Sequence, residues 1–342
     1  MQKKDIKNFT LNELQKEVKH LGEQKYRAAQ LFDLLYKKGI EDLRDMLNLP
    51  ASFRDLLQEN YYISKVDLVK LAKSKDQTEK YLFKLEDENL IESVVIFSDK
   101  RVTECVSSQI GCKYNCLFCE SGKKGFTRNL TVSEIINQIL FVKKKMKSNP
   151  NNIVFMGIGE PLDNYDNVEK TICLLNSKDA FNIGARKITI STCGIIPAIK
   201  RLQERNWQIE LSVSLHAPEN KLRSYLMPVN NIYPLPELIE SCKNYADKTN
   251  RQITFEYILI KGLNDSLNYA DKLATLISGF NSKVNLISFN LVPGSLLQAT
   301  AAPQVKSFKS KLIAKGIPTI IRISKGDDIS AACGQLKSLH LK

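Results

Sequence analysis

Residues 1–60 carry hydrophobic positions that recur every three or four residues. This spacing predicts amphipathic helices, the first of which has the apolar residues Leu11, Leu14, Val18 and Leu21. Thr10 and Glu13 have the spacing of a capping box at its start. A second helix is expected over Ala28–Leu35, and Pro50 is expected to end the helical region. Residues 1–60 are therefore predicted to form a small helical N-terminal accessory domain.

Residues 61–100 have a different pattern, in which short apolar segments flank a polar turn. Lys80–Leu85 and Leu90–Phe97 have the composition of strands, and Glu86–Asn89 between them is typical of a turn. We therefore expect a β-hairpin connector over residues 61–100 that leads into the larger part of the chain.

From about residue 103 onward, short apolar segments alternate with helical patterns. The expected strands are Glu104–Ser108, Ile153–Ile158, Lys187–Thr192, Ile209–Leu215, Ile253–Ile260 and Val284–Asn290. Thr131 and Glu134 again fit a capping box. Alternation of strands and helices implies parallel strands with right-handed crossovers. Residues 101–342 are therefore predicted to form an α/β fold, an open or partial barrel of about six βα units, although a doubly wound sheet also fits the pattern.

The chain is basic, because 50 lysines and arginines stand against 37 acidic residues and give a net charge of +13. A basic excess favours a polyanionic partner, since neutralised phosphates release counterions. The lysine-rich composition of an A/T-rich genome explains the excess equally well. No stretch reaches the roughly 18 apolar residues of a membrane span, and the N-terminus lacks an apolar signal core. A cytoplasmic protein without a membrane partner is expected.

Eight cysteines in such a chain favour metal or redox chemistry over disulfides. Three of them, Cys112, Cys116 and Cys119, lie within eight residues just after the first expected strand of the α/β region. Thiolates ligate iron–sulfur clusters, and three ligands without an evident fourth leave one iron open. A structural zinc site normally has four protein ligands, and none of the three histidines is close to this loop in sequence. The loop therefore favours a cluster over zinc.

The CxxxCxxC loop, followed by a strand that ends in Gly-Glu-Pro, resembles the radical-SAM superfamily. Further motifs in the same order resemble the RlmN/Cfr family of RNA methyltransferases and extend over nearly the whole chain. They are Cys105–Cys112, Arg128–Thr131, Phe155–Pro161, Ser191–Gly194, Ser214–Ala217 and Gly326–Leu336. The resemblance implies a partial (β/α)6-type radical-SAM barrel, a 4Fe–4S cluster on Cys112, Cys116 and Cys119, and S-adenosylmethionine (SAM) as cosubstrate.

The resemblance also implies a SAM site at the carboxyl ends of the expected strands, where parallel βα folds bind ligands. The matching positions are Gly159, Glu160, Ser191, Ser214, Leu215, His216 and Asn290. A carboxylate at Glu160 suits the methionine ammonium of SAM. Without the resemblance, Glu160 is interpreted as a helix N-terminal carboxylate and His216 as a structural histidine.

Three further positions match residues that act on the methyl group in the family. Cys333 matches a cysteine that accepts a methyl group from a first SAM as a thiolate. A second SAM yields a 5′-deoxyadenosyl radical that removes hydrogen from this methyl group, and the carbon radical adds to adenine. Glu92 matches the base that removes the ring proton, and Cys105 the cysteine that forms a disulfide with Cys333 to release product. Taken alone, Cys333 and Cys105 fit packing positions, and a strand glutamate usually faces solvent.

The Gly-Asp-Asp-Ile sequence before Cys333 favours the RlmN branch, which methylates carbon 2 of adenine, over the Cfr branch, which methylates carbon 8. The resemblance implies 23S rRNA as substrate, tRNA as a second substrate, and an electron donor such as flavodoxin or ferredoxin. A monomer is expected, because the sequence gives no sign of oligomerisation.

Two other classes of protein remain open. One is a different radical-SAM enzyme, which needs neither Cys333 nor Cys105, and the other is an RNA-binding module with structural zinc. Glu120, directly after the cysteine loop, departs from the neutral segment of many relatives. An acidic residue there puts fine specificity in doubt.

Overall fold

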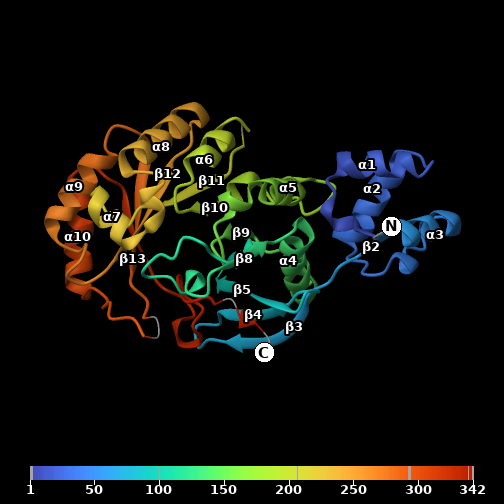
Figure 1. Cartoon of the computed structure of the whole chain (residues 1–342), viewed down its shortest axis with the longest axis horizontal. Helices are drawn as coiled ribbons and strands as arrows, with labels where there is room; N and C mark the ends of the chain where they lie inside the picture. Colours follow the sequence, from blue (N-terminus) through green and yellow to red (C-terminus); the bar gives the residue numbers. More distant parts are fainter. Residues whose placement is uncertain (1–2, 100, 206, 292–293, 338, 341–342) are drawn as a thin grey trace.

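The computed structural model describes residues 3–99, 101–205, 207–291, 294–337 and 339–340. The molecule is elongated, with a helical N-terminal part at one end and a larger α/β part forming the rest (Figure 1). No helix in these ranges is long and apolar enough to cross a membrane.

The N-terminal part combines helices with a short strand pair. Its elements are β1 (Lys4–Asp5), α1 (Leu11–His20), α2 (Tyr26–Phe32), α3 (Ala51–Asn60) and β2 (Tyr61–Tyr62), and β1 pairs in parallel with β2. The predicted capping box is confirmed, since the Glu13 N–H donates to the Thr10 hydroxyl and the Thr10 N–H donates to the Glu13 carboxylate. The expectation for Pro50 is wrong: it is the N-cap residue of α3, where its missing N–H costs no helical hydrogen bond.

A β-hairpin follows the helices, as the sequence predicts. β4 (Glu79–Lys84) and β5 (Asn89–Ser98) pair antiparallel, with Leu82 opposite Glu92. β3 (Asp67–Lys73) pairs with the other edge of β4. The side chains of β3 are mostly exposed, so its sequence lacks the alternation that marks a half-buried strand.

The main sheet has the strand order β14-β13-β12-β11-β10-β9-β6-β5-β4-β3, and β15 (Leu339–His340) pairs with β5. The strands from β14 to β6 are parallel. They are β6 (Arg101–Cys105), β9 (Asn152–Phe155), β10 (Ile188–Thr192), β11 (Glu210–Ser214), β12 (Ile253–Leu259), β13 (Ser282–Ser288) and β14 (Thr319–Arg322). A separate pair, β7 (Gln109–Gly111) and β8 (Phe126–Asn129), flanks the cysteine loop.

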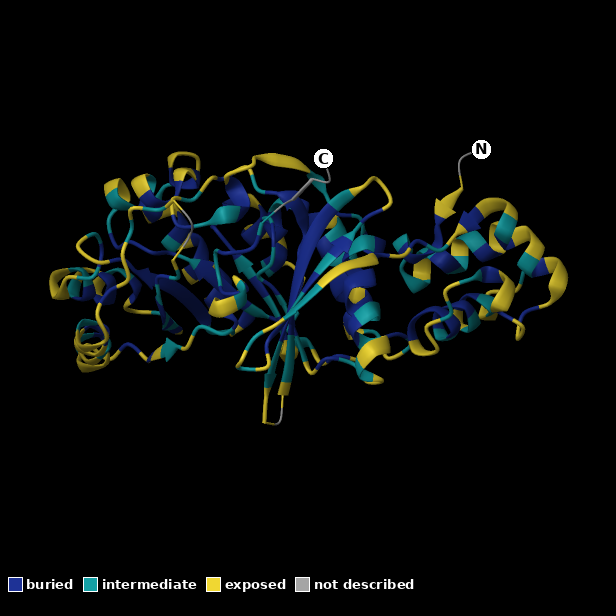
Figure 2. Cartoon of the chain, turned by 90° about the horizontal axis from the view of Figure 1, so that it is seen from below, coloured by how far each residue is buried: buried dark blue, intermediate teal, exposed yellow. Residues whose placement is uncertain are grey.

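Helices pack against the parallel strands and leave their outer faces exposed (Figure 2). They are α4 (Val132–Met146), α5 (Tyr165–Asn176), α6 (Ile196–Gln203), α7 (Asn220–Leu226), α8 (Leu235–Thr249), α9 (Leu267–Ile277) and α10 (Ala302–Ala314). A helix separates each pair of consecutive parallel strands from β6 to β14. The predicted α/β fold, a partial barrel with a small helical N-terminal part, is therefore confirmed.

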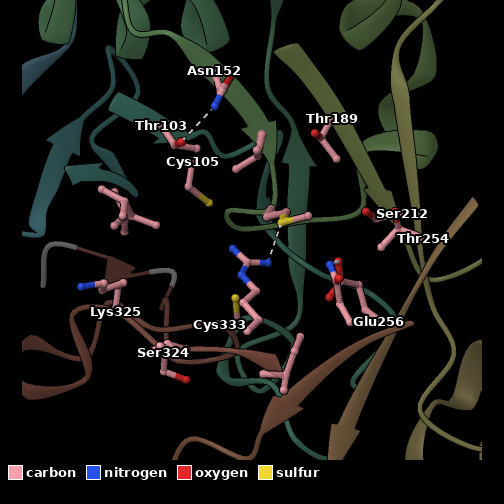
Figure 3. A pocket seen from close by; sticks show the side chains of 18 of the residues that line it. Thr103, Cys105, Asn152, Thr189, Ser212, Thr254, Glu256, Ser324, Lys325 and Cys333 are labelled. Carbon is pink, nitrogen blue, oxygen red and sulfur yellow. Dashed lines mark hydrogen bonds between the residues drawn. The ribbon is translucent and has the colours of Figure 1, made fainter. Parts of the chain in front are cut away.

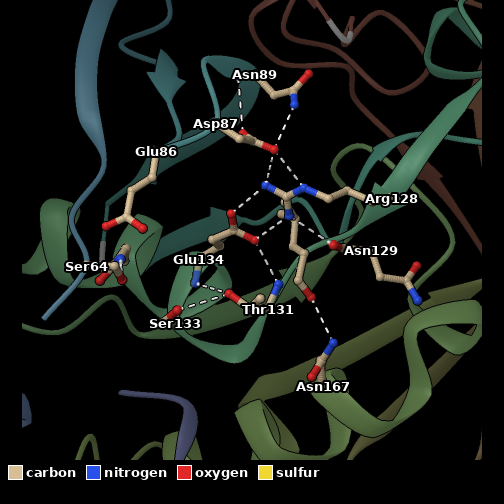
Figure 4. A network of polar contacts seen from close by, with 12 residues as sticks. Ser64, Glu86, Asp87, Asn89, Arg128, Asn129, Thr131, Ser133, Glu134 and Asn167 are labelled. Carbon is tan, nitrogen blue, oxygen red and sulfur yellow. Dashed lines mark hydrogen bonds and ion pairs between the residues drawn. The ribbon is translucent and has the colours of Figure 1, made fainter. Parts of the chain in front are cut away.

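The start of α4 is tied to the hairpin through Arg128 (Figure 4). Arg128 Nη1 and Nη2 donate to the Glu134 carboxylate at 2.8 and 2.7 Å, and Nε donates to Asp87 at 2.8 Å. Glu134 also accepts from the Thr131 N–H, which completes the predicted capping box of α4. The Arg128–Thr131 motif thus has a structural function, because it joins the turn of the hairpin to the first helix of the barrel.

Candidate active site

The cysteine loop between β7 and β8 is held by backbone contacts. The Cys112 N–H donates to the Gly125 carbonyl at 3.1 Å, and the Leu117 N–H donates to the Leu226 carbonyl at 3.0 Å. Gly111 has a φ of 77°, and a Cβ atom there would lie 1.9 Å from the Gly125 oxygen. Only glycine therefore allows the loop to close at this point.

The thiols of this loop are close enough to one another to interact electrostatically. Burial, with a smaller contribution from Cys119, raises the pKa of Cys112 to about 12. Burial also raises the pKa of Cys116 and of Cys119. Within the described residues, no three Cys, His, Asp or Glu side chains converge on a single metal ion. Three soft thiols on one loop are instead a donor set that fits an iron–sulfur cluster, whose positive iron ions favour the thiolate form.

Glu160 is buried at the end of the loop after β9, where two backbone N–H groups orient its carboxylate. Oε1 accepts from the Leu162 N–H at 3.0 Å, and Oε2 accepts from the Cys193 N–H at 2.7 Å. Gly159 has a φ of 100°, and a Cβ atom there would lie 2.4 Å from the Gln109 Cβ. The carboxylate thus caps a short helix, as its structural interpretation predicts.

Other predicted SAM contacts lie where the neighbouring strands β10 and β11 end. These residues are Ser191, Ser214, Leu215 and His216. The His216 ring is buried, Nδ1 accepts from the Ile258 N–H at 3.0 Å, and the ring packs edge-on against Phe118 with centroids 4.6 Å apart. Burial lowers the pKa of His216 to about 3, so the ring is neutral. His216 is a satisfied core histidine that also contacts the cysteine loop.

The segment that carries Cys333 packs directly against the cysteine loop. The Glu120 N–H donates to the Gly334 carbonyl at 2.7 Å. A Cβ atom on Gly334 would lie 2.8 Å from the Phe118 oxygen. Asn290 Nδ2 donates to the Cys333 carbonyl at 3.2 Å. Folding therefore brings together Cys333, Asn290 and the cysteine loop, which are far apart in sequence.

The acidic residue after the loop does not carry an isolated charge. The Glu120 side chain forms ion pairs with Lys123 and, at 3.9 Å, with Lys337. These two cations offset the negative charge beside the cysteine loop.

A cavity of about 600 Å³ opens beside Cys105 and Cys333, which both line it (Figure 3). Burial, with a smaller contribution from the neighbouring Cys333, raises the pKa of Cys105 to about 12. Both are free cysteines. The predicted disulfide between Cys105 and Cys333 is therefore not formed in this structure.

Glu92 lies on β5 next to this cavity but is not among its lining residues. The expectation for a strand glutamate fails here, since the side chain is buried. Its Oε1 forms an ion pair with Lys80 at 3.1 Å, and its Oε2 accepts from the Lys337 N–H at 2.8 Å. Two residues further along β5, Val94 lines the cavity.

Sequence reasoning missed three polar residues of the cavity, Glu256, Asn285 and Arg322. Glu256 and Asn285 are register partners on neighbouring strands, and Arg322 comes from the strand beyond them, so only the folded sheet brings the three side chains into one cavity. Cys333 raises the pKa of Arg322, and Glu256 and Cys105 raise it further. A permanent positive charge thus lies beside both cysteines of the cavity.

Basic side chains surround the cavity at the amino ends of the strands. They are Arg101, Arg186, Lys187 and Lys283, and a further lysine, Lys325, lines the cavity from beyond the carboxyl end of β14. Glu210 is the acidic residue of this rim, and it forms an ion pair with Arg251. The mouth of the cavity is therefore positively charged, which favours a polyanionic ligand.

Comparison with known proteins agrees with this geometry. Residues 4–63 match the family described as Ribosomal RNA large subunit methyltransferase N-terminal domain, and residues 106–273 match the Radical SAM superfamily. The chain is 46% identical over 340 residues to "Probable dual-specificity RNA methyltransferase RlmN" of Clostridium novyi (strain NT), with 99% of each chain covered.

Two further relatives cover nearly the whole chain. "Dual-specificity RNA methyltransferase RlmN" of Geotalea uraniireducens (strain Rf4) is 44% identical over 98% of this chain and 97% of its own. The crystal structure of a radical SAM methyltransferase from Sphaerobacter thermophilus superposes with a TM-score of 0.92 and 40% identity, over 97% of this chain and 99% of that one. With the cysteine loop and the strand-end residues in place, these likenesses show that the chain belongs to the RlmN family of radical SAM RNA methyltransferases.

Proposed function

We propose that this enzyme methylates carbon 2 of an adenine in 23S rRNA, and in tRNA as a second substrate, through a methyl group carried on Cys333. One observation carries the proposal: Cys333 and Cys105 line one cavity, and the segment with Cys333 contacts the cysteine loop. A methyl carrier and a second thiol are needed only if the methyl group passes through the protein.

Each cysteine has a distinct task in this proposal. Cys333, which lies beside the Arg322 guanidinium, takes the methyl group of a first SAM by displacement and releases S-adenosylhomocysteine. When bound at Cys112, Cys116 and Cys119, the cluster and a second SAM supply the radical that takes hydrogen from this methyl group. Cys105 then attacks the sulfur of Cys333, so that an S–S bond forms as the bond between that sulfur and the product carbon breaks. An external thiol reductant restores both cysteines.

Glu92 is the proposed base for the ring proton of adenine. Lys80 and the Lys337 N–H hold its carboxylate in place next to the cavity. Lys337 follows the cavity residue Leu336, so the segment that contacts Glu92 also forms part of the cavity wall.

RNA is the proposed substrate because the mouth of the cavity is basic. Its arginines and lysines contact phosphates, while one base enters the cavity. A base can reach Cys333 only if it leaves its stack, as in other enzymes that act on bases.

The test uses enzyme with its cluster reconstituted anaerobically, methyl-labelled SAM, a reductant and protein-free 23S rRNA. Digested RNA is analysed by mass spectrometry for the position of the methyl group. Carbon-2 methyladenosine is expected, together with equal amounts of S-adenosylhomocysteine and methionine per methyl group.

Cys333→Ala is expected to remove all methylation without removing the cluster. The matched control is Cys173→Ala, since Cys173 is an exposed cysteine on α5 away from the cavity, and it should keep full activity. A carbon-8 product would assign the enzyme to the Cfr type of reaction. Methylation that survives in Cys333→Ala would overturn the methyl-cysteine mechanism.

A further inference from the structure

The wall of the cavity opposite the cysteines contains two buried hydrogen-bond acceptors that no donor in the described part of the chain meets in good geometry. Glu256 is 4% exposed, and its Oε1 accepts from Asn285 Nδ2 at 3.0 Å. The other carboxylate oxygen, Oε2, makes no hydrogen bond of good geometry to any described residue, and neither does Asn285 Oδ1. A buried acceptor without a donor is costly, so the pair is suited to a ligand that brings N–H groups.

The sheet topology sets this pair across the cavity from Cys105. Glu256 is on β12 and faces Asn285 on β13, whereas Cys105 is on β6, with β9, β10 and β11 in between. Figure 3 shows Ser212, Thr254 and Glu256 together on one side, with Cys105 and Cys333 on the other. A planar ligand that reaches the two cysteines therefore presents its opposite edge to Glu256.

The charges of this wall favour a ligand edge with both a donor and an acceptor. Burial raises the pKa of Glu256, while Arg322, Asn285 and Ser212 lower it. Arg322 lines the same cavity, and its positive charge acts on Glu256, so this wall also offers N–H donors. Adenine combines an exocyclic amino group with an adjacent ring nitrogen, so its edge complements this set of groups.

We propose that Glu256, positioned by Asn285, accepts a hydrogen bond from the exocyclic amino group of the adenine that is methylated. This inference rests on the proposed function and adds the group that selects the base. The amino group of SAM is the competing donor. Glu256 is level with Ser214 on the neighbouring strand β11. The cavity that Glu256 lines nevertheless contains Cys105 and Cys333, and neither Glu160 nor Ser214 is among its lining residues. These positions favour the base.

The test compares two RNA substrates that differ at the target nucleotide alone, one with adenosine and one with purine riboside, which lacks the amino group. Wild-type holoenzyme is expected to prefer adenosine by roughly 10- to 100-fold in kcat/KM, as for a buried hydrogen bond to a charged group. Glu256→Met keeps the side-chain length without an acceptor and should reduce this preference to about twofold or less. Glu256→Gln keeps one acceptor and should retain part of it.

Two controls separate base selection from other effects. Thr254→Val removes a hydroxyl on the same wall and should keep the wild-type preference. The SAM concentration for half-maximal SAM cleavage should be the same in wild type and Glu256→Met. If Glu256→Met does not fold, Asn285→Leu frees the carboxylate from its partner and should also lower the preference.

The two substrates also separate this inference from the proposed function. Unchanged preference in an active Glu256→Met enzyme would overturn the inference and leave RNA methylation standing. A raised SAM requirement with unchanged preference would assign Glu256 to the cosubstrate instead. If the wild-type enzyme methylates no adenosine, the proposed function fails. In that case the binding affinities of the two RNAs test the inference, and equal affinities would overturn it as well.

Discussion

Single glycines decide how closely the chain approaches itself around the site. Gly159 orients Glu160, because its φ of 100° and its contact with Gln109 leave no room for a side chain. Gly111 does the same for the cysteine loop against Gly125. Both glycines are needed for the direction of the backbone, and neither takes part in the chemistry.

Gly159→Ala is therefore expected to destabilise the protein by about 2 kcal/mol or more, since an L-residue is strained at this φ and its Cβ meets Gln109. Glu160 should lose its alignment, and SAM affinity should fall with it. Urea unfolding and equilibrium dialysis with SAM measure the two effects. Gly184→Ala is the control, because a Cβ atom there meets nothing within 4 Å. Equal stabilities of the two variants would contradict this role of Gly159.

Glu104 provides a pH-dependent contribution to stability. It is fully buried, its Oε2 has no hydrogen bond to a described residue, and burial raises its pKa from 4.5 to about 8. The folded protein binds this proton more tightly than the unfolded chain does. The stability that protonated Glu104 contributes is therefore fully present below pH 4.5 and is lost as the pH rises to about 8.

The Glu104→Gln side chain cannot ionise, so this variant should lose less free energy of unfolding than wild type when the pH rises from 5 to 8. The two losses should differ by on the order of several kcal/mol. Thermal unfolding of both proteins at the two pH values measures it. Glu59→Gln on the exposed side of α3 should behave as wild type. Parallel stability curves for wild type and Glu104→Gln would show that this carboxyl group is not protonated in the folded protein.

The residues of the cysteine loop could be predicted because their spacing in sequence carries the chemistry. Glu256 and Arg322 could not be predicted, because each is an isolated polar residue and its neighbours in the cavity come from other strands. Glu92 shows the same limit: a strand pattern does not tell which face the C-terminal segment covers.

At the scale of elements, the first helix of the barrel is fixed by its N-terminus. Thr131 and Glu134 cap α4, and Arg128 connects the cap to Asp87 in the hairpin turn (Figure 4). The cap could be predicted because Thr131 and Glu134 are close in sequence. The hydrogen bond from Arg128 to Asp87 could not be predicted, because these two residues are far apart in sequence.

Thr131→Ala should cost about 1 kcal/mol, the usual effect of losing an N-cap hydroxyl. The loss should appear first as faster hydrogen exchange in the first turn of α4. Thr131→Ser keeps the hydroxyl and should have nearly wild-type exchange. If both variants exchange alike, the hydroxyl does not stabilise α4.

The sequence predicted the strands that are buried on both sides, such as β12, whose residues are all buried. It did not predict β14, where a short segment of four residues is only partly buried. Strand ends were also displaced: β9 ends at Phe155 instead of the expected Ile158, because Gly157 already bonds to the Val106 backbone in the loop to Glu160.

At the scale of the whole molecule, a basic mouth leads to a cavity with two cysteines and a buried carboxylate. The net charge of +13 did not indicate where the cations gather, since the amino ends of the strands come together only in the folded sheet. The helical N-terminal part lies at one end of the long axis (Figure 1).

Lys187→Ala at the mouth should weaken RNA binding and reduce the slope of log affinity against log salt by about 0.9, the effect of one lost phosphate contact. Lys306→Ala on the exposed face of α10 should leave the slope unchanged. Fluorescence anisotropy over a series of salt concentrations gives both slopes. An unchanged slope in Lys187→Ala would exclude this lysine from phosphate binding.

The distance in sequence between Cys333 and the loop it packs against has a consequence for translation. More than two hundred residues separate Cys112 from Cys333, which a ribosome needs about 10–40 s to add. The three thiols that bind iron are therefore synthesised well before the thiol that receives the methyl group. A nascent chain can therefore bind iron while the segment with Cys333 is not yet synthesised and the cavity still lacks one wall. The metal site can be filled before the enzyme is able to carry a methyl group.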